Sequence, residues 1–130
     1  MKRTKDELNA QLLYWATKGS LSLVKEFIGQ GADPHFRGDT VLKHACLNGK
    51  AHVVSYLLAK FKQDGTDLTM LQHYCCRSGE LEVLKEVTVD SSTIRLIKLA
   101  NLASKFNQTH LVDYLLERAV GDLERQEHVA

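Results

Sequence analysis

Histidine and cysteine side chains, which can bind metals or carry redox chemistry, lie close together at two places in the sequence. The two clusters are His44-x-Cys46 and His73-x-Cys75-Cys76. A structural zinc site usually needs a C-x₂₋₄-C pair with two further ligands, and neither cluster has that spacing. We therefore favour a packing role for these cysteines and predict no metal and no cofactor. The adjacent Cys75-Cys76 pair leaves soft-metal binding or oxidant sensing as an alternative.

The other polar residues form no recognisable catalytic motif. The sequence has no phosphate-binding G-x-x-x-x-G-K-[ST] loop, no G-x-S-x-G and no H-E-x-x-H. Its six histidines are scattered. Acidic pairs such as Glu80 and Glu82 would point in different directions from a helix, because residues two apart do not share a face. We predict that the protein is not an enzyme.

Charge and composition narrow the classes of partner. The net charge is +1, so no overall field attracts nucleic acid or an anionic membrane. No apolar run approaches the roughly 20 residues that a membrane-spanning helix needs, and the N-terminus lacks the apolar core of a signal peptide. The three cysteines cannot all pair with one another. We expect them to be reduced, and the protein to be cytoplasmic.

Helical hairpins must position these residues, and the clearest hairpin runs from Gly38 to Lys60. Gly38-Asp39-Thr40 predicts a turn followed by a capping hydroxyl. Asn48-Gly49 ends the first helix, because glycine tolerates the left-handed conformation of a helix end. The apolar positions of the two helices are Leu42, Ala45, Cys46, Val53, Val54, Leu57 and Leu58. A hairpin of this size is too small to bury its own core and has to stack on copies of itself.

Copies of this hairpin recur at spacings of 30, 30 and 28 residues. We call the residues that end the first helix of each copy the anchors, and they are Gly19, Gly49, Gly79 and Asn107. We predict left-handed conformations for all four, since asparagine is the next-best residue for that region. Positions five and eight after each anchor are apolar: Val24, Val54, Leu84 and Val112, then Phe27, Leu57, Val87 and Leu115. The residue three positions before each anchor is small, which predicts that two helices approach closely there. These residues are Ala16, Cys46, Cys76 and Ser104.

Local signals set the expected helix bounds outside this hairpin. We expect helices at about 5–18, 21–29, 69–77, 81–88, 94–106 and 109–119. Thr4 and Glu7 fit a capping box before the first of these. Residues 121–130 are mostly polar and either extend the last helix or fray. Both ends have the character of caps, so we expect a whole small protein rather than a slice of a long array.

The repeat resembles the ankyrin repeat, whose pattern includes T-P-L-H-x-A and a period of about 33. Residues 40–45 read Thr-Val-Leu-Lys-His-Ala at that place, and Gly31-Ala32-Asp33 matches the family's G-A-D ending. The third copy departs from the pattern, with Gln72 at a normally apolar position and His73 at the histidine position. The third and fourth copies lack G-A-D, and each copy is about three residues short.

The resemblance implies an all-α, ankyrin-like solenoid of stacked helix-turn-helix repeats. Because the missing residues fall where the family forms β-hairpin fingers, we expect short or absent fingers. The chain would be one domain, 1–130, with repeats at about 5–35, 36–65, 66–92 and 93–120 and a polar tail at 121–130.

The resemblance also implies a protein-interaction module that binds through a concave inner-helix face. Exposed inner positions are expected one, two and six residues before each anchor, and four of these twelve residues are basic while none is acidic. The candidate partner-binding residues, all expected to be exposed, are Lys18, Lys43, Leu47, Asn48, Arg77, Ser78, Lys105 and Phe106.

The chemistry of these residues favours a protein partner with an acidic surface. The alternative without a binding role is that the lysines and the arginine only keep their helices soluble. Two other functions stay open: an effector or inhibitor from a virus, phage or intracellular bacterium that occludes a host protein, and, more weakly, nucleic-acid binding through the basic face.

Overall fold

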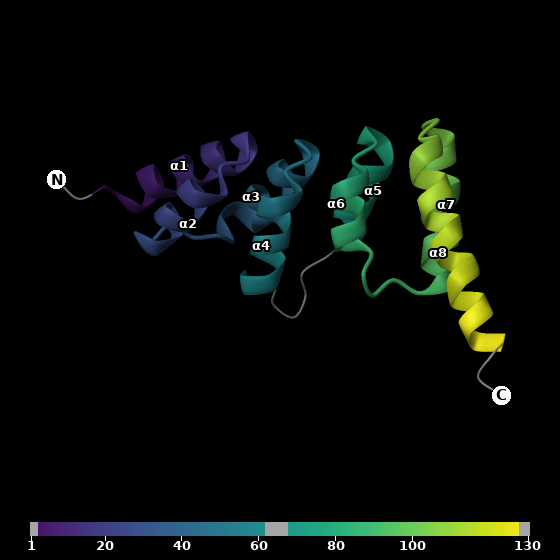
Figure 1. Cartoon of the computed structure of the whole chain (residues 1–130). Coiled ribbons are helices and arrows are strands. Elements are labelled where there is room, and N and C mark those ends of the chain that lie inside the picture. The colour runs from purple at the N-terminus through teal and green to yellow at the C-terminus, as the bar shows by residue number, and fades with distance from the viewer. Residues whose placement is uncertain (1–2, 62–67, 128–130) are drawn as a thin grey trace. The chain divides into compact units, whose positions relative to one another are not determined.

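The computed structural model describes residues 3–61 and 68–127, with side chains up to residue 126 (Figure 1). Every helix or strand in these ranges is an α-helix, so the all-α prediction is confirmed. The helices are α1 (Lys5–Lys18), α2 (Leu21–Gly29), α3 (Phe36–Leu47), α4 (Ala51–Phe61), α5 (Leu68–Ser78), α6 (Leu81–Val87), α7 (Thr93–Lys105) and α8 (Thr109–Glu127). They form two compact units, Met1–Thr66 and Asp67–Ala130.

The predicted helix bounds hold closely, except at the last helix. The bounds of α1 and α2 are those expected from the sequence. Thr4 caps α1 by accepting a hydrogen bond from the Glu7 backbone N–H at 3.2 Å. Ser92 caps α7 in the same way, accepting from the Arg95 N–H at 3.1 Å. The last helix does not stop near residue 119 but continues to Glu127, so the tail extends the helix over residues 120–127.

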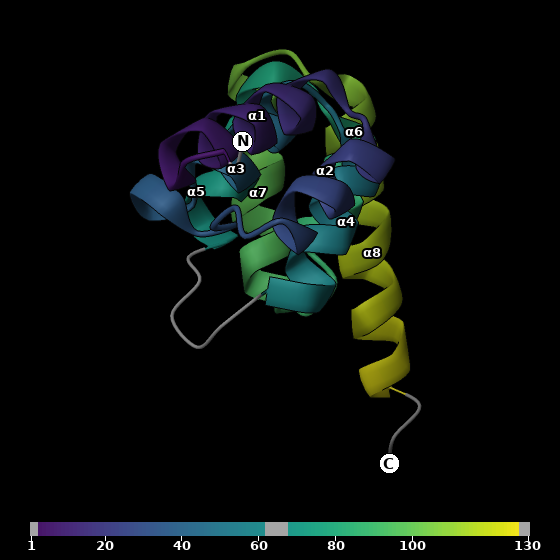
Figure 2. The ribbon, with the colours of Figure 1, turned by 90° about the vertical axis from the view of Figure 1, so that its left-hand side faces the viewer.

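In the first unit the helices form two layers. Helix α1 packs against both α2 and α3, while α4 packs against α3 and α2. Figure 2 shows α1 beside α3 in one layer and α2 beside α4 in the other. The predicted core residues Leu42 and Leu57 are 6% and 4% exposed, which confirms their place in the core. Leu58, the last residue of the predicted stripe, is only half-buried.

The second unit repeats this arrangement with a different core. Helix α5 packs against α6 and α7, and α7 packs against α8. Its core is apolar apart from two polar side chains, Gln72 and Thr88, which are 5% and 0% exposed. The Thr88 hydroxyl, just after the end of α6, donates to the Leu84 carbonyl at 2.7 Å. Gln72 is hydrogen-bonded to groups beyond α5, so its burial leaves its amide satisfied.

All four anchors adopt the predicted left-handed conformation, with φ of 85° at Gly19, 69° at Gly49, 78° at Gly79 and 58° at Asn107. The anchor N–H groups donate to carbonyls in the last turn of the preceding helix, for example Gly79 to Cys75 at 2.8 Å. These bonds satisfy acceptors that a helix end leaves open. The repeat register read from the sequence is therefore correct at each helix pair.

The connections that follow α2 and α6 are short and contain no strand. After α2, the Asp33 N–H donates to Asn9 Oδ1 at 2.7 Å, and Asp33 Oδ1 accepts from the His35 N–H at 2.9 Å. Left-handed residues follow at Arg37, Gly38 and Asp39, so regular α3 geometry begins at Thr40. The predicted Gly38-Asp39 turn is therefore present. The remaining connection, which follows α4, lies outside the described residues.

One small-residue position was predicted wrongly. Ala16, Cys46 and Cys76 are buried, but Ser104 is exposed and the small buried residue of α7 is Ala103. Cys76 lies against the next first helix, since its Sγ donates to the Leu99 carbonyl at 3.6 Å. Among the described residues no further first helix follows α7, so nothing covers the side of α7 on which Ser104 lies.

Candidate functional site

The cysteines that could bind a metal or react are buried. All three are free thiols inside the protein. Burial raises the pKa of Cys46 from 9.0 to about 12. Burial also raises the pKa of Cys76 to about 11, against a smaller lowering by the positive charge of Arg95. Both thiols stay protonated at neutral pH and are poor nucleophiles and poor metal ligands.

The histidines of the two clusters do not complete a metal site. His44 is half-buried and His73 is exposed. Within residues 3–61 and 68–126, no three side chains of His, Cys, Asp or Glu come together in a way that could hold a metal ion. The cysteines of both clusters, Cys46, Cys75 and Cys76, pack in the cores of their units at 0% exposure.

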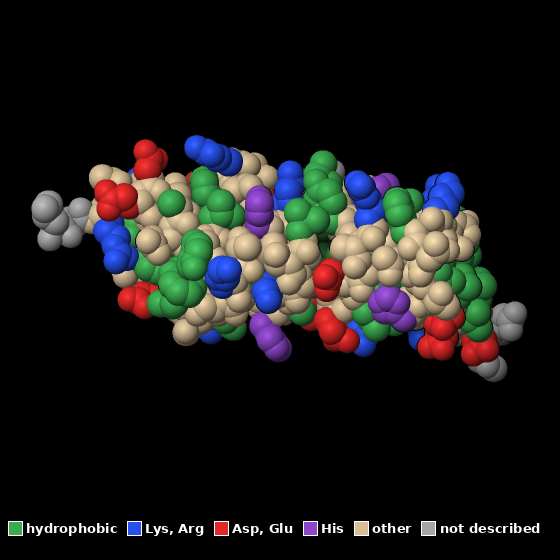
Figure 3. Space-filling view, turned by 90° about the horizontal axis from the view of Figure 1, so that it is seen from above, with side chains coloured by type: hydrophobic (Ala, Val, Ile, Leu, Met, Phe, Trp, Pro, Cys, Tyr) green, Lys and Arg blue, Asp and Glu red, His purple; other side chains and the backbone are tan. Residues whose placement is uncertain are grey.

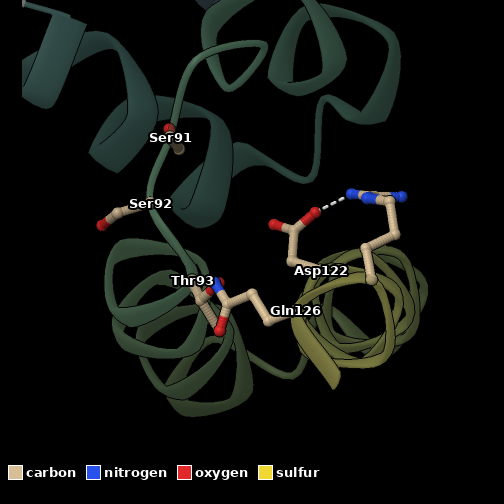
Figure 4. Close-up of a pocket in the computed structure, with 6 residues that line it drawn as sticks. Ser91, Ser92, Thr93, Asp122 and Gln126 are labelled. Atoms are coloured by element: carbon tan, nitrogen blue, oxygen red, sulfur yellow. Dashed lines mark hydrogen bonds and ion pairs between the residues drawn. The ribbon is translucent and has the colours of Figure 1, made fainter. Parts of the chain in front are cut away.

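A shallow open pocket lies in the second unit where the start of α7 meets the last turns of α8. It is lined by Ser91, Ser92, Thr93, Asp122, Arg125 and Gln126 (Figure 4). Several of its polar groups are already engaged, because Ser92 caps α7 and Arg125 pairs with Asp122 on its own helix. No sequence motif indicates this pocket, which depends on the continuation of α8 beyond residue 119.

In the first unit, three of the four candidate partner-binding residues are exposed. Lys18, Leu47 and Asn48 lie at the ends of α1 and α3, with Leu47 40% exposed. The Asn48 side-chain amide donates to the His44 carbonyl at 2.8 Å, which extends the end of α3. Lys43 was expected to be exposed, but it is half-buried and interacts with other groups of the protein. Its side chain is therefore a weaker candidate for contact with a partner.

Lys18 lies over an aromatic ring that sequence reasoning missed. Its ammonium is 5.6 Å from the centroid of the Tyr14 ring, and Tyr14 is 52% exposed. The two residues are four apart on α1, a spacing that places side chains on one helix face. The contact between Tyr14 and Lys18 could have been predicted from this spacing. The pair presents a positive charge and an exposed ring at one place on the surface.

In the second unit, the candidates come from two different helices and meet. Arg77 on α5 and Phe106, which caps α7, lie with the guanidinium 5.8 Å from the ring centroid. Both are exposed, Phe106 by 42%. Lys105 is exposed beside Phe106, and the Ser78 hydroxyl donates to the Tyr74 carbonyl at 2.7 Å. Sequence spacing chose these residues separately, and the fold brings Arg77 and Phe106 together.

The segment that joins α7 to α8 holds this pair in place. The Gln108 side-chain amide donates to the Arg77 carbonyl at 3.1 Å, and His110 Nε2 lies 3.0 Å from the Gly79 carbonyl. These contacts connect the end of α5 to the start of α8. In Figure 3, basic and hydrophobic side chains both reach the surface seen from above.

The second helices carry a repeated contact of their own. The Lys25 ammonium lies 5.2 Å from the centroid of Tyr56, and the Lys85 ammonium lies 5.7 Å from that of Tyr114. The two pairs occupy the same repeat positions, one in each unit. Because these lysines are engaged with rings and Lys85 also pairs with Glu82 at 3.3 Å, they brace neighbouring second helices.

Paired helices joined by tight left-handed turns at a near-constant spacing define a helical-repeat protein. A family model described as Ankyrin repeats (3 copies) matches residues 12–95. The chain belongs to the ankyrin-repeat family, which confirms the resemblance seen in its motifs. The match ends inside α7, so most of the fourth helix pair lies outside it.

The chain is also similar to a protein of Acanthamoeba polyphaga mimivirus that carries the name of an ankyrin repeat protein, L675. The two are 32% identical over 103 residues, which is 78% of this chain and 22% of that protein. The chain therefore spans about a fifth of the length of this relative. Among the described residues, no helix has the length and apolar character needed to cross a bilayer.

Proposed function

We propose that this chain binds a protein partner through the exposed ends of its first helices. Ankyrin repeats are generally protein-protein interaction modules rather than catalysts. The observation that carries the proposal is the exposed contact of Arg77 with Phe106, at 5.8 Å, where two helices of one unit meet. An arginine held against an aromatic ring is a common type of anchor residue in interfaces, since little side-chain freedom remains to be lost on binding.

The partner in this proposal has an acidic surface. Lys18, Arg77 and Lys105 are exposed and positively charged, and no acidic residue occupies an equivalent position in the repeat. The planar guanidinium of Arg77 can donate two hydrogen bonds to one carboxylate. Within the second unit, Phe106 supplies apolar contact beside Arg77. Leu47 is an exposed apolar residue of the first unit. Asn48 and Ser78 use their side chains to close helix ends, so we assign them to the rim of the contact.

The test is a pair of charge reversals within one unit. Arg77→Glu with Lys105→Glu should weaken binding at least ~10-fold, because both charges are exposed and face an acidic partner. We choose Lys105 instead of Lys43 because Lys43 is half-buried. Folding should be unchanged, as judged by the thermal midpoint.

The control reverses two charges on α6, in the opposite helix layer, through Glu82→Lys with Glu86→Lys. Glu82 is exposed and Glu86 is half-buried. The partner is first obtained by capture on the immobilised chain, with and without nuclease treatment of the lysate. Capture that disappears with nuclease favours the nucleic-acid alternative. If the Glu82/Glu86 variant loses binding and the Arg77/Lys105 variant does not, the proposed surface is wrong.

A second candidate function is an effector or inhibitor that occludes a host protein. The observation in its favour is the similarity to a mimivirus protein. Under this function the captured partner should lose its own activity, or its own binding to a third protein, when the chain is added.

The three buried free thiols support our further proposal of a reducing compartment such as the cytoplasm.

A further inference from the structure

Helix α8 has an apolar stripe on each of two sides. Leu111, Leu115 and Ala119 form the inner stripe and are at most 2% exposed. Leu116, Val120 and Leu123 form a second stripe, at i, i+4 and i+7, and are 42%, 52% and 47% exposed. A surface helix normally has one apolar face. The second stripe is therefore unpartnered in this unit.

A shallow depression runs along this outer stripe around Gly121. It is lined by Asp113, Leu116, Glu117, Val120, Gly121 and Glu124. Gly121 does not have a positive φ, so its backbone does not require glycine. A Cβ added at Gly121 would meet only the Arg125 guanidinium, at 3.8 Å. Glycine inside a helix lowers stability by about 1 kcal/mol relative to alanine. The missing side chain at Gly121 also leaves a hollow in the surface.

The rim of the hollow carries three carboxylates, and none of them forms an ion pair with another described residue. Asp113, Glu117 and Glu124 are all exposed. The arginines of α8 are engaged elsewhere: Arg118 donates to the Thr88 carbonyl at 2.7 Å, and Arg125 pairs with Asp122. In the described part of α8, no lysine is present. An apolar stripe flanked by three carboxylates is complementary to an apolar stripe flanked by lysine or arginine.

We propose that the outer face of α8 binds a basic amphipathic helix of a partner protein. This face consists of the six residues that line the depression together with Leu123. A helix fits because α2, which is equivalent to α8, is covered by another helix, α4, in the first unit. Ile28, at the repeat position of Leu116, is half-buried there. A second copy of α8 would bring the same carboxylates and no free cation. The surface is separate from the proposed inner site.

The experiment measures binding of a labelled 18-residue helical peptide to the full chain by fluorescence anisotropy. The peptide has leucines at i, i+4, i+7 and i+11 and lysines beside them. Two comparison peptides replace all lysines by glutamate or all leucines by serine. The leucine-lysine peptide should bind at least ~10-fold more tightly than either, with an affinity that falls as salt rises.

Substitutions on α8 locate the contact. Leu116→Gln with Val120→Gln, and separately Glu117→Gln with Glu124→Gln, should each weaken peptide binding at least ~10-fold without changing the thermal midpoint. Gly121→Leu fills the hollow and should also weaken binding. Because leucine has the higher helix propensity, this variant should melt at a higher temperature, and its loss of binding cannot come from unfolding.

The matched controls are Ile94→Gln on α7 and Glu82→Gln with Glu86→Gln on α6, which should bind the peptide like the parent chain. Arg77→Glu should also leave peptide binding unchanged, which separates this surface from the inner site. Equal binding of all three peptides would overturn the proposal, as would unchanged binding in all the α8 variants. Self-association of the parent chain in sedimentation that disappears in the Leu116/Val120 variant would also overturn it, by assigning the stripe to a second copy.

Discussion

The two units fill the same repeat position with different chemistry. Seven residues before the anchors, the first unit buries two leucines, Leu12 and Leu42, at 0% and 6% exposure. At this position the second unit buries Gln72 and Ala100, at 5% and 2%. The comparison shows that the repeat fixes which positions are buried, while the chemistry that satisfies each position can change from apolar packing to hydrogen bonding.

Gln72 joins three segments that apolar packing alone would hold less specifically. Its Nε2 donates to the Val87 carbonyl at 2.8 Å and to Ser91 Oγ at 3.2 Å. Its Oε1 accepts from Arg95 Nε at 2.9 Å. The connection after α6 and the start of α7 are thus tied to α5 by directional bonds. The first unit relies instead on the volume of Leu42 at the equivalent place.

The largest effect that tests this comparison is expected in the first unit. Leu42→Ala should lower the free energy of unfolding by about 2–5 kcal/mol, since it removes buried methyl groups and leaves a cavity. Chemical denaturation followed by circular dichroism measures the change. A variant as stable as the parent would mean that Leu42 does not fill the core of this unit.

A change at Gln72 should have a somewhat smaller effect of a different origin. Gln72→Leu restores the family's apolar residue, but it leaves the Val87 carbonyl and the Arg95 guanidinium without their partner. We expect a loss of about 1–3 kcal/mol in denaturant unfolding. Arg95→Met in the same chain should recover part of the loss, because both members of the pair then become apolar. A stabilised Gln72→Leu single variant would contradict the role assigned to this network.

The anchors provide a comparison between equivalent glycines in the two units. A Cβ at Gly79 would lie 2.6 Å from Gln108 Oε1, and one at Gly19 would lie 2.7 Å from Lys50 Cδ. The Lys50 side chain can move away, whereas Gln108 is hydrogen-bonded to the Arg77 carbonyl. Both alanine variants should lose about 1–2 kcal/mol from left-handed strain, with the larger loss for Gly79→Ala. Thermal melts of the two variants side by side give the order, and a larger loss at Gly19 would reverse this account of the two turns.

Ionisation of the buried thiols should have the smallest effect on the free energy of unfolding, and it should have this effect only at high pH. The folded state holds the Cys46 proton up to a pKa of about 12, whereas the unfolded chain loses it near 9.0. The unfolded chain therefore binds fewer protons above pH 9, so the free energy of unfolding should fall as pH rises through this window and be unaffected below it. Cys46→Ala should show a smaller fall. The difference in this fall between the parent chain and Cys76→Ala reports on the Cys76 thiol. That difference should stop growing at a lower pH, because the folded-state pKa of Cys76 is about 11.

Metal chelators provide a further check on the thiols. Since burial keeps Cys46 and Cys76 protonated, a chelator should leave the thermal midpoint unchanged. Elemental analysis that finds about one zinc per chain would contradict the packing role of the His-x-Cys clusters.

The local features of the fold could be predicted from sequence because their causes are local. Gly19 and Asn107 identify left-handed turns through their own backbone preferences, and Thr4 identifies a helix start through its own hydroxyl. Apolar spacing then placed Leu42 and Leu57 in the core. Each of these inferences needs only a few neighbouring residues, so the register of all four helix pairs could be found.

Features that depend on what covers a helix could not be predicted in this way. Ser104 satisfies the small-residue pattern, yet it is exposed because no further first helix follows in the described chain. The burial of Lys43 and the contact of Arg77 with Phe106 also depend on how helices pack. Gln72 departs from the apolar pattern, and its partners lie 15 to 23 residues away in sequence.

The left-handed turn at Asn107 has a consequence for how such a chain can diverge. Three of the four turns use glycine, and the fourth keeps the same backbone shape, with φ of 58°, without it. Asparagine tolerates this region at lower cost than other side chains, so selection can act on the shape of the turn and leave the residue free to drift within a narrow set. The same interchangeability makes the four turns natural junctions for recombination. Whole helix pairs could be exchanged or duplicated between them in the laboratory, with each junction closing in the same way.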